Sequence, residues 1–110
     1  KARYVIHTVG PIWQGGGHGE AAALAACYRS CLELAREHRI DSVDFPSIST
    51  GVYGYPMAQA ASVALKAIMD DLRTYDHPRR VRMVCHTETA ASIYRQTYNL
   101  WYAETKEDRL

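Results

Sequence analysis

Three short stretches of apolar and β-branched residues alternate along the chain with longer stretches in which apolar residues recur at helical spacing. Residues 4–9 are mostly β-branched and stop at Gly10-Pro11, which predicts a buried strand. Residues 43–45 predict a second strand, which Pro46 halts, and residues 81–85 predict a third. All three strands are short, as expected for strands in the interior of a small domain.

The longer stretches predict three amphipathic helices. The first begins near Glu20 and ends near His38-Arg39. The second begins at Pro56, whose missing N–H suits the first turn of a helix. Thr87 can cap the third. The apolar faces of the three helices contain Leu24, Cys27, Tyr28, Cys31 and Ala35, then Ala61, Ala64, Leu65, Ile68 and Leu72, then Ala90, Ala91, Tyr94, Tyr98 and Trp101.

The resulting order of elements is β-α-β-α-β-α. This alternation is typical of an α/β layer fold with substantially parallel strands and right-handed crossovers. Ligands bind to such sheets at the carboxyl ends of the strands. The loops at that end are residues 10–19, 47–55 and 86–89, so candidate chemistry is expected there.

Composition indicates one soluble globular domain. The chain has 110 residues, of which 47% are hydrophobic and 23% charged, and no stretch approaches the 18 apolar residues of a membrane span. Thirteen Lys and Arg against 12 Asp and Glu give a net charge of +1. That balance argues against nucleic acid as a partner, and the cluster Arg79, Arg80 and Arg82 is interpreted as a solvated patch.

The three cysteines are an odd number, which does not suit a disulfide scaffold and favours a reducing compartment, the cytoplasm. The chain starts with Lys1-Ala2-Arg3, without a signal peptide and without an initiator Met. We therefore expect it to be a fragment.

The segment from Phe45 to Pro56, between a predicted strand and a predicted helix, carries the most specific chemistry. Gly51 and Gly54 let a ligand approach the backbone, and successive amides beside a helix N-terminus form a concave anion site. Ser49 and Thr50 add hydroxyl donors, while Tyr53 and Tyr55 add flat apolar walls suited to a sugar. These residue types suit a phosphate or diphosphate that carries a ribose. A tight turn that binds nothing is equally compatible with the residues alone.

Ser-Thr-Gly-Val-Tyr-Gly-Tyr-Pro, at positions 49–56, resembles the second ligand loop of macro domains, which are ADP-ribose-binding modules. Residues 4–11 resemble the family's strand before its glycine loop, and residues 27–35 resemble the helix that follows. The likeness extends from about Ala2 to Trp101. It is greatest to the branch that includes mono-ADP-ribosyl and O-acetyl-ADP-ribose hydrolases.

The resemblance implies a truncated three-layer α/β/α macro-like fold, with residues 1–103 as a partial domain and residues 104–110 as a charged tail. It implies that the backbone amides of the loop hold the diphosphate and distal ribose, with Tyr53 beside that ribose. It also places His86 where family members pack an aromatic ring against adenine. The implied ligand-binding residues are Ser49, Thr50, Gly51, Val52, Tyr53, Gly54, Tyr55 and His86.

The family's first ligand loop, an Asn-Ala-Ala-Asn segment followed by glycines and Asp-Gly, has no counterpart in this sequence. Gly15-Gly16-Gly17 lacks the Asn and Asp and follows a different strand. In the family the first loop supplies the Asn for the distal ribose and residues implicated in hydrolysis. We therefore expect no catalytic residue in this chain, and no cofactor or metal.

Several other residues have a structural and a functional interpretation. Core packing is favoured over zinc for Cys27 and Cys31, because no second pair of ligands matches them. Cys85 and His86 should point to opposite faces of a strand, which argues against a catalytic pair. Of the remaining candidates, His7 is expected in the interior, His18 closer to a ligand, Asp44 on an exposed strand face, and Tyr94, Tyr98 and Trp101 in the core or an interface.

Three functions follow from these observations. The first is binding of ADP-ribose or a related ligand without catalysis. The second is an ADP-ribosyl or O-acetyl-ADP-ribose hydrolase whose first loop lies outside this sequence. The third is a macro-derived protein that keeps the fold and has no ligand.

The resemblance also implies an upstream strand between those that match residues 4–9 and 43–46. Its absence would leave backbone groups unpaired on both neighbours. Closure within one chain is one remedy. A homodimer that uses residues 4–9 and the last helix, through Tyr94, Tyr98 or Trp101, is favoured.

Overall fold

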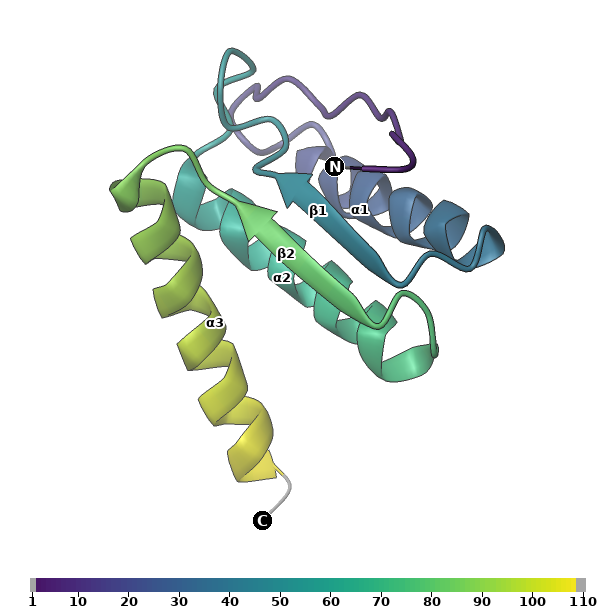
Figure 1. The fold of residues 1–110 in the computed structure, drawn as a ribbon. Helices are drawn as coiled ribbons and strands as arrows, with labels where there is room; N and C mark the ends of the chain where they lie inside the picture. The colour runs from purple at the N-terminus through teal and green to yellow at the C-terminus, as the bar shows by residue number, and fades with distance from the viewer. Residues whose placement is uncertain (1, 109–110) are drawn as a thin grey trace.

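The computed structural model describes the backbone of residues 2–108 and the side chains of residues 2–101. In chain order the elements are α1 (Glu20–Glu37), β1 (Ser42–Pro46), α2 (Met57–Thr74), β2 (Arg80–Val84) and α3 (Glu88–Asp108). Helices therefore alternate with strands, and a segment without regular secondary structure, residues 2–19, precedes α1 (Figure 1). The α/β class predicted from the sequence is confirmed.

The sheet in the described part of the chain consists of β1 and β2, which pair in parallel with Phe45 opposite Met83. Alternate residues face the helices: Phe45 is buried, and Val43, Val81 and Met83 pack against the same core. The other face of both strands is exposed along its whole length. Helices thus cover one face (Figure 1), and the described residues do not form the second helical layer of a three-layer fold.

The core lies between the sheet and the helices α1 and α2. Tyr28, Leu24 and Leu32 of α1 are fully buried there. The α2 side is lined mostly by small residues, Ala60, Ala61, Ala64 and Ala67. Small side chains let the two helix backbones approach closely, so α2 fills the space behind the sheet without large aromatic residues.

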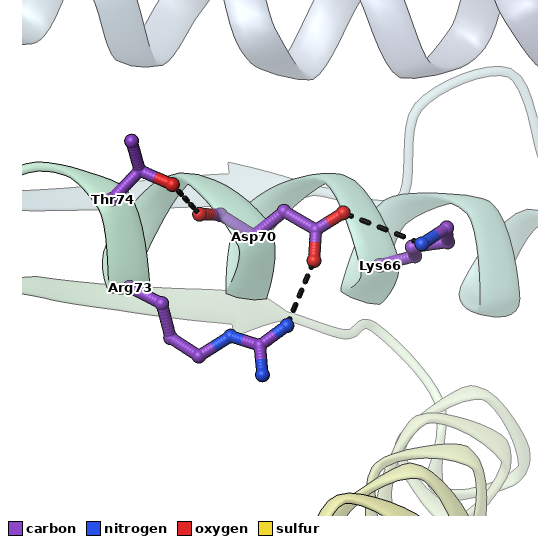
Figure 2. A network of polar contacts seen from close by, with 4 residues as sticks. All are labelled: Lys66, Asp70, Arg73 and Thr74. Atoms are coloured by element: carbon purple, nitrogen blue, oxygen red, sulfur yellow. Dashed lines mark hydrogen bonds and ion pairs between the residues drawn. The ribbon is translucent and has the colours of Figure 1, made fainter.

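A partly buried ion pair joins α1 to α2. Arg36 Nη1 lies 3.0 Å from Asp71 Oδ2 and also donates to the carbonyl of His77 at 3.3 Å. The Arg36 guanidinium stacks over the Tyr75 ring, 3.7 Å from its centroid. On the exposed side of α2, Asp70 accepts from Lys66 and Arg73, and Thr74 donates to its carbonyl (Figure 2).

The predicted first strand is wrong. Residues 4–9 are extended but pair with no strand in the described structure, and Val5 and Val9 are 74% and 79% exposed. A strand requires a hydrogen-bonded neighbour, and β1 lies across a cleft from this segment. The interior position predicted for His7 is wrong for the same reason, because its side chain is exposed.

The helix boundaries follow the sequence closely. Pro56, which was predicted to lie in the first turn of the second helix, is the N-cap of α2, and the helix begins one residue later at Met57. The predicted cap of α3 is confirmed, because Thr87 Oγ1 accepts from the amide of Ala90 at 3.1 Å. The backbone of α3 continues through residue 104 to Asp108. The division into residues 1–103 and 104–110 stays a prediction. No helix in the described part of the chain is long and apolar enough to cross a membrane.

Asp71→Asn should lower the free energy of unfolding by about 1–3 kcal/mol, because it removes the charge that faces Arg36 between two helices. Asp70→Asn is the matched control, since Asp70 is exposed and its pairs lie within one helix. That change should cost about 0.5 kcal/mol or less. Urea unfolding at neutral pH measures both, and equal effects would contradict the role given to Asp71.

Candidate functional site

The loop of residues 47–55 connects β1 to α2 and is held by its own hydrogen bonds. The amide of Tyr55 donates to the carbonyl of Ser49 at 2.9 Å, and that of Gly54 donates to Gly51 at 3.0 Å. Ser49 and Gly54 adopt left-handed conformations, with φ of 68° and 75°. The chain thereby turns back on itself and projects residues 50–53 away from the core.

Three successive amides at the tip of this loop, those of Gly51, Val52 and Tyr53, donate to no other group among the described residues. A Cβ placed at Gly51 would meet nothing within 4 Å. The Val52 side chain is fully exposed, and Tyr53 is 38% exposed. The following helix adds the free N–H groups of its first turn. This arrangement presents hydrogen-bond donors to solvent and suits an anion.

Two tyrosine hydroxyls anchor the start of the loop. Tyr28 donates to the carbonyl of Pro46 at 3.3 Å and accepts from the amide of Ile48 at 3.1 Å. The Tyr94 hydroxyl lies 2.6 Å from Ser47 Oγ. Burial raises the pKa of both tyrosines, and that of Tyr28 well above its ordinary value, so both stay protonated. Tyr94 is thus a core residue with a polar partner.

The predicted site residues differ in what their side chains can reach. Ser49 Oγ is buried without a partner, facing Gly10, and Thr50 Oγ1 donates to the carbonyl of Ser47 at 2.9 Å. These hydroxyls are turned away from the tip. Tyr55 is 3% exposed, so the expectation that its ring forms a wall of the site is wrong: the ring packs in the core.

His86 is exposed just beyond the carboxyl end of β2, while the loop begins at the carboxyl end of β1. Because the two strands run in parallel, the loop and His86 lie at the same edge of the sheet. No hydrogen bond, ion pair or ring contact joins His86 to the loop among the described residues. The place of His86 beside adenine therefore stays a prediction.

The glycine-rich loop before α1, residues 10–19, contacts the loop of residues 47–55, which is the candidate ligand loop. The sequence did not indicate this contact. The amide of Trp13 donates to the carbonyl of Tyr53 at 2.9 Å, and its ring centroid lies 4.7 Å from that of Tyr55. Glu20 accepts from the amides of Gln14, Gly16 and His18 at 2.7–3.0 Å. The available signal was an acidic residue directly after a glycine loop, at a helix start that lacks a side-chain cap.

Glu20 is held ionised by these contacts. Burial alone would raise its pKa, but the amide hydrogen bonds outweigh it and lower the pKa from 4.5 to about 2. The helix N-terminus favours the same charge. The carboxylate therefore acts as a fixed acceptor for the loop of residues 14–18.

The other candidates have structural roles. Cys27 Sγ donates to the carbonyl of Val9, and Cys31 is buried, which raises its pKa. No group of metal-ligating residues occurs in the described part of the chain. Asp44 lies on the exposed strand face, as predicted. Its two hydrogen bonds from Arg82 lower its pKa, which disfavours a general base.

A cleft of about 1280 Å³ separates residues 2–10 from β1 and reaches the ligand loop. Its walls include Ile6 and Val9 on one side and Asp44 and Phe45 on the other, and Ser49 and Tyr53 lie at its end. One edge of β1 is therefore unpaired among the described residues, because β2 occupies the other edge.

A family model described as Macro domain matches residues 1–64. The O-acetyl-ADP-ribose deacetylase of Salmonella gallinarum is 53% identical over 94 residues, which are 86% of this chain and 52% of that protein. The Oceanobacillus iheyensis macrodomain with ADP has a TM-score of 0.85 and 42% identity, and the match covers 89% of this chain and 51% of that one.

The Trypanosoma brucei macrodomain in complex with ADP-ribose has a TM-score of 0.78 and 35% identity, over 86% of this chain and 39% of that one. This chain spans about half the length of the curated relatives it matches, such as the Salmonella protein. Of these two macrodomain structures, the first contains ADP and the second contains ADP-ribose.

The stability that Glu20 contributes should depend on pH. Because its folded-state pKa of about 2 lies below the ordinary 4.5, the contribution is complete above pH 4.5 and is lost as the pH falls toward 2. Urea unfolding of the wild type and Glu20→Gln should thus differ most near pH 6, and less at pH 3. A difference that does not change with pH would contradict the ionised acceptor.

Proposed function

The chain belongs to the macro domain family, and from this premise we propose that it binds ADP-ribose, or a related nucleoside diphosphate ribose, through the loop of residues 47–55. The observation that carries the proposal is the row of three unpartnered amides at Gly51, Val52 and Tyr53. Such a row matches the oxygens of a diphosphate. The similar structures that contain ADP and ADP-ribose support this class of ligand.

In this proposal the loop binds through its backbone and works as a phosphate-binding loop. Gly51, Val52, Tyr53 and Gly54 contribute amides or open space, and the exposed part of the Tyr53 ring lies beside the distal ribose. The hydroxyl of Thr50, which donates to the carbonyl of Ser47, and the buried ring of Tyr55 keep the loop in shape. His86, at the same edge of the sheet, contacts the adenine.

Binding without turnover is the form of the proposal that the residues favour. Among the described residues near the loop, Tyr28 and Tyr94 are held protonated, and Asp44 is paired with Arg82. None of these groups is a ready general base. The free thiols of Cys27, Cys31 and Cys85 suit a reducing compartment, so we place this binding in the cytoplasm.

A hydrolase is the second candidate, because the 53% identical relative is an O-acetyl-ADP-ribose deacetylase. This chain spans about half of that protein, so the activity of the whole protein is a separate proposal. Release of acetate from O-acetyl-ADP-ribose by the purified chain would favour the hydrolase. Binding without release would favour the module.

Gly51→Glu should abolish ADP-ribose binding in isothermal titration calorimetry, because it places bulk and negative charge where the diphosphate sits. Ser30→Glu is the control, since it adds comparable bulk and the same charge at an exposed position of α1, outside both loops. The control should keep the wild-type affinity within about twofold. A wild-type chain that binds no ADP-ribose even at millimolar concentration would refute the proposal.

We also propose that the chain forms a homodimer. Residues 4–9 present exposed apolar side chains, and one edge of β1 is unpaired among the described residues, so a second copy could cover both. Tyr94 is buried in its own core, and the Trp101 ring lies under Arg73, which favours an interface on residues 4–9 and β1 over one on α3.

Light scattering at micromolar concentration should give twice the mass of one chain, and Val5→Asp should shift it to the monomer. Val52→Asp places the same charge on an exposed valine of the ligand loop and should leave the dimer intact. A wild-type monomer that unfolds cooperatively would contradict the dimer and favour closure within one chain.

A further inference from the structure

Glu20 is a buried carboxylate with no cationic partner in the described part of the chain. Its charge is balanced by main-chain donors: Oε2 accepts from Gln14 at 2.8 Å and Gly16 at 3.0 Å, and Oε1 accepts from His18 at 2.7 Å. One side chain therefore organises a five-residue stretch of glycine-rich backbone. Burying an ion in this way is costly unless its lone pairs are filled, as they are here.

The stretch that Glu20 organises lies directly on Trp13. Gly16 has φ of 95°, and a Cβ at this position would come within 3.0 Å of the Trp13 ring. The backbone at Gly16 therefore rests against the indole. Because the Gly16 amide is bound by Glu20, the carboxylate sets where this backbone presses on the ring.

Trp13 in turn contacts the loop of residues 47–55 at two points, so its position affects that loop. Its amide donates to the carbonyl of Tyr53 at 2.9 Å, and its ring packs against that of Tyr55. Tyr53 is the last of the three residues whose amides are unpartnered, and its carbonyl is held from outside the loop. The Tyr53 carbonyl shares its peptide group with the N–H of Gly54, which donates to the carbonyl of Gly51. A shift of Trp13 would therefore displace this peptide group and, through the Tyr53 backbone, the preceding peptide whose N–H faces the anion.

We propose that Glu20 is a positioning residue for the ligand site, which acts through Gly16 and Trp13 to orient the amides around Tyr53. Glu20 itself does not touch the ligand. This inference rests on the proposed function, because the loop is taken to bind a nucleoside diphosphate ribose. It assigns a role in ligand affinity to a glycine loop that lies outside the binding motif.

Glu20→Gln tests the proposal with little change in size. The glutamine side chain has one acceptor oxygen fewer than glutamate, and its NH₂ group would face the backbone N–H groups that Glu20 binds. Calorimetry should show ADP-ribose affinity at least about tenfold weaker with an unchanged stoichiometry, because the chain stays folded while the loop is misoriented. Simple destabilisation would instead lower the fraction of binding-competent chains. Glu33→Gln, exposed on the same helix, is the matched control and should bind like the wild type.

Fluorescence gives a second readout that does not need a ligand. In a Trp101→Phe background Trp13 is the single tryptophan, and its emission should shift to longer wavelength when Glu20→Gln releases the ring. If Glu20→Gln does not fold, Trp13→Leu breaks the same link. It should also weaken binding at least about tenfold.

A folded Glu20→Gln chain with unchanged Trp13 emission and an affinity within twofold of the wild type would overturn the positioning role. So would a Trp13→Leu chain that binds like the wild type. If the wild type binds no ADP-ribose but Glu20→Gln still shifts the Trp13 emission, the proposed function fails while the link from Glu20 to Trp13 stands.

Discussion

The side chain of Tyr28 connects α1 to the end of β1 and to the start of the loop of residues 47–55. Its ring is fully buried on α1 and packs edge-on against Phe45 of β1, with ring centroids 4.9 Å apart. Its hydroxyl donates to the last residue of β1 and accepts from Ile48 at the start of the ligand loop. A buried amide without an acceptor costs about 1–3 kcal/mol, so the loop leaves the sheet where this hydroxyl stands. The same side chain thus packs in the core and holds the start of the candidate site.

The sequence predicted the elements that local chemistry determines. The helical spacing of apolar residues, the cap at Thr87 and the apolar runs of β1 and β2 all depend on residues close to one another in the chain. The extended segment of residues 4–9 shows the limit of this reasoning, because its β-branched pattern is real but a strand also requires a neighbour. His7 and Tyr55 were misplaced for related reasons, since what surrounds them comes from distant segments.

The site was predictable in outline and not in detail. The glycines and the position between strand and helix indicated a backbone anion site, and the described structure has unpartnered amides there. The bonds that turn the Thr50 hydroxyl inward, and the contact from Trp13, link residues whose sequence separation carries no pattern. Glu20 looked like an ordinary helix start, and only the folded loop shows that its carboxylate accepts from three amides. Pattern thus indicated a candidate site, while long-range contacts determine the shape of its loop.

The central claim is that the amides at the loop tip receive the diphosphate, and a titration followed by ¹H–¹⁵N NMR tests it most directly. ADP-ribose should move the amide signals of Gly51, Val52 and Tyr53 most strongly, while adenosine, which lacks the diphosphate, should leave these three nearly unchanged. Large shifts confined to other residues, or equal shifts with adenosine, would contradict the account.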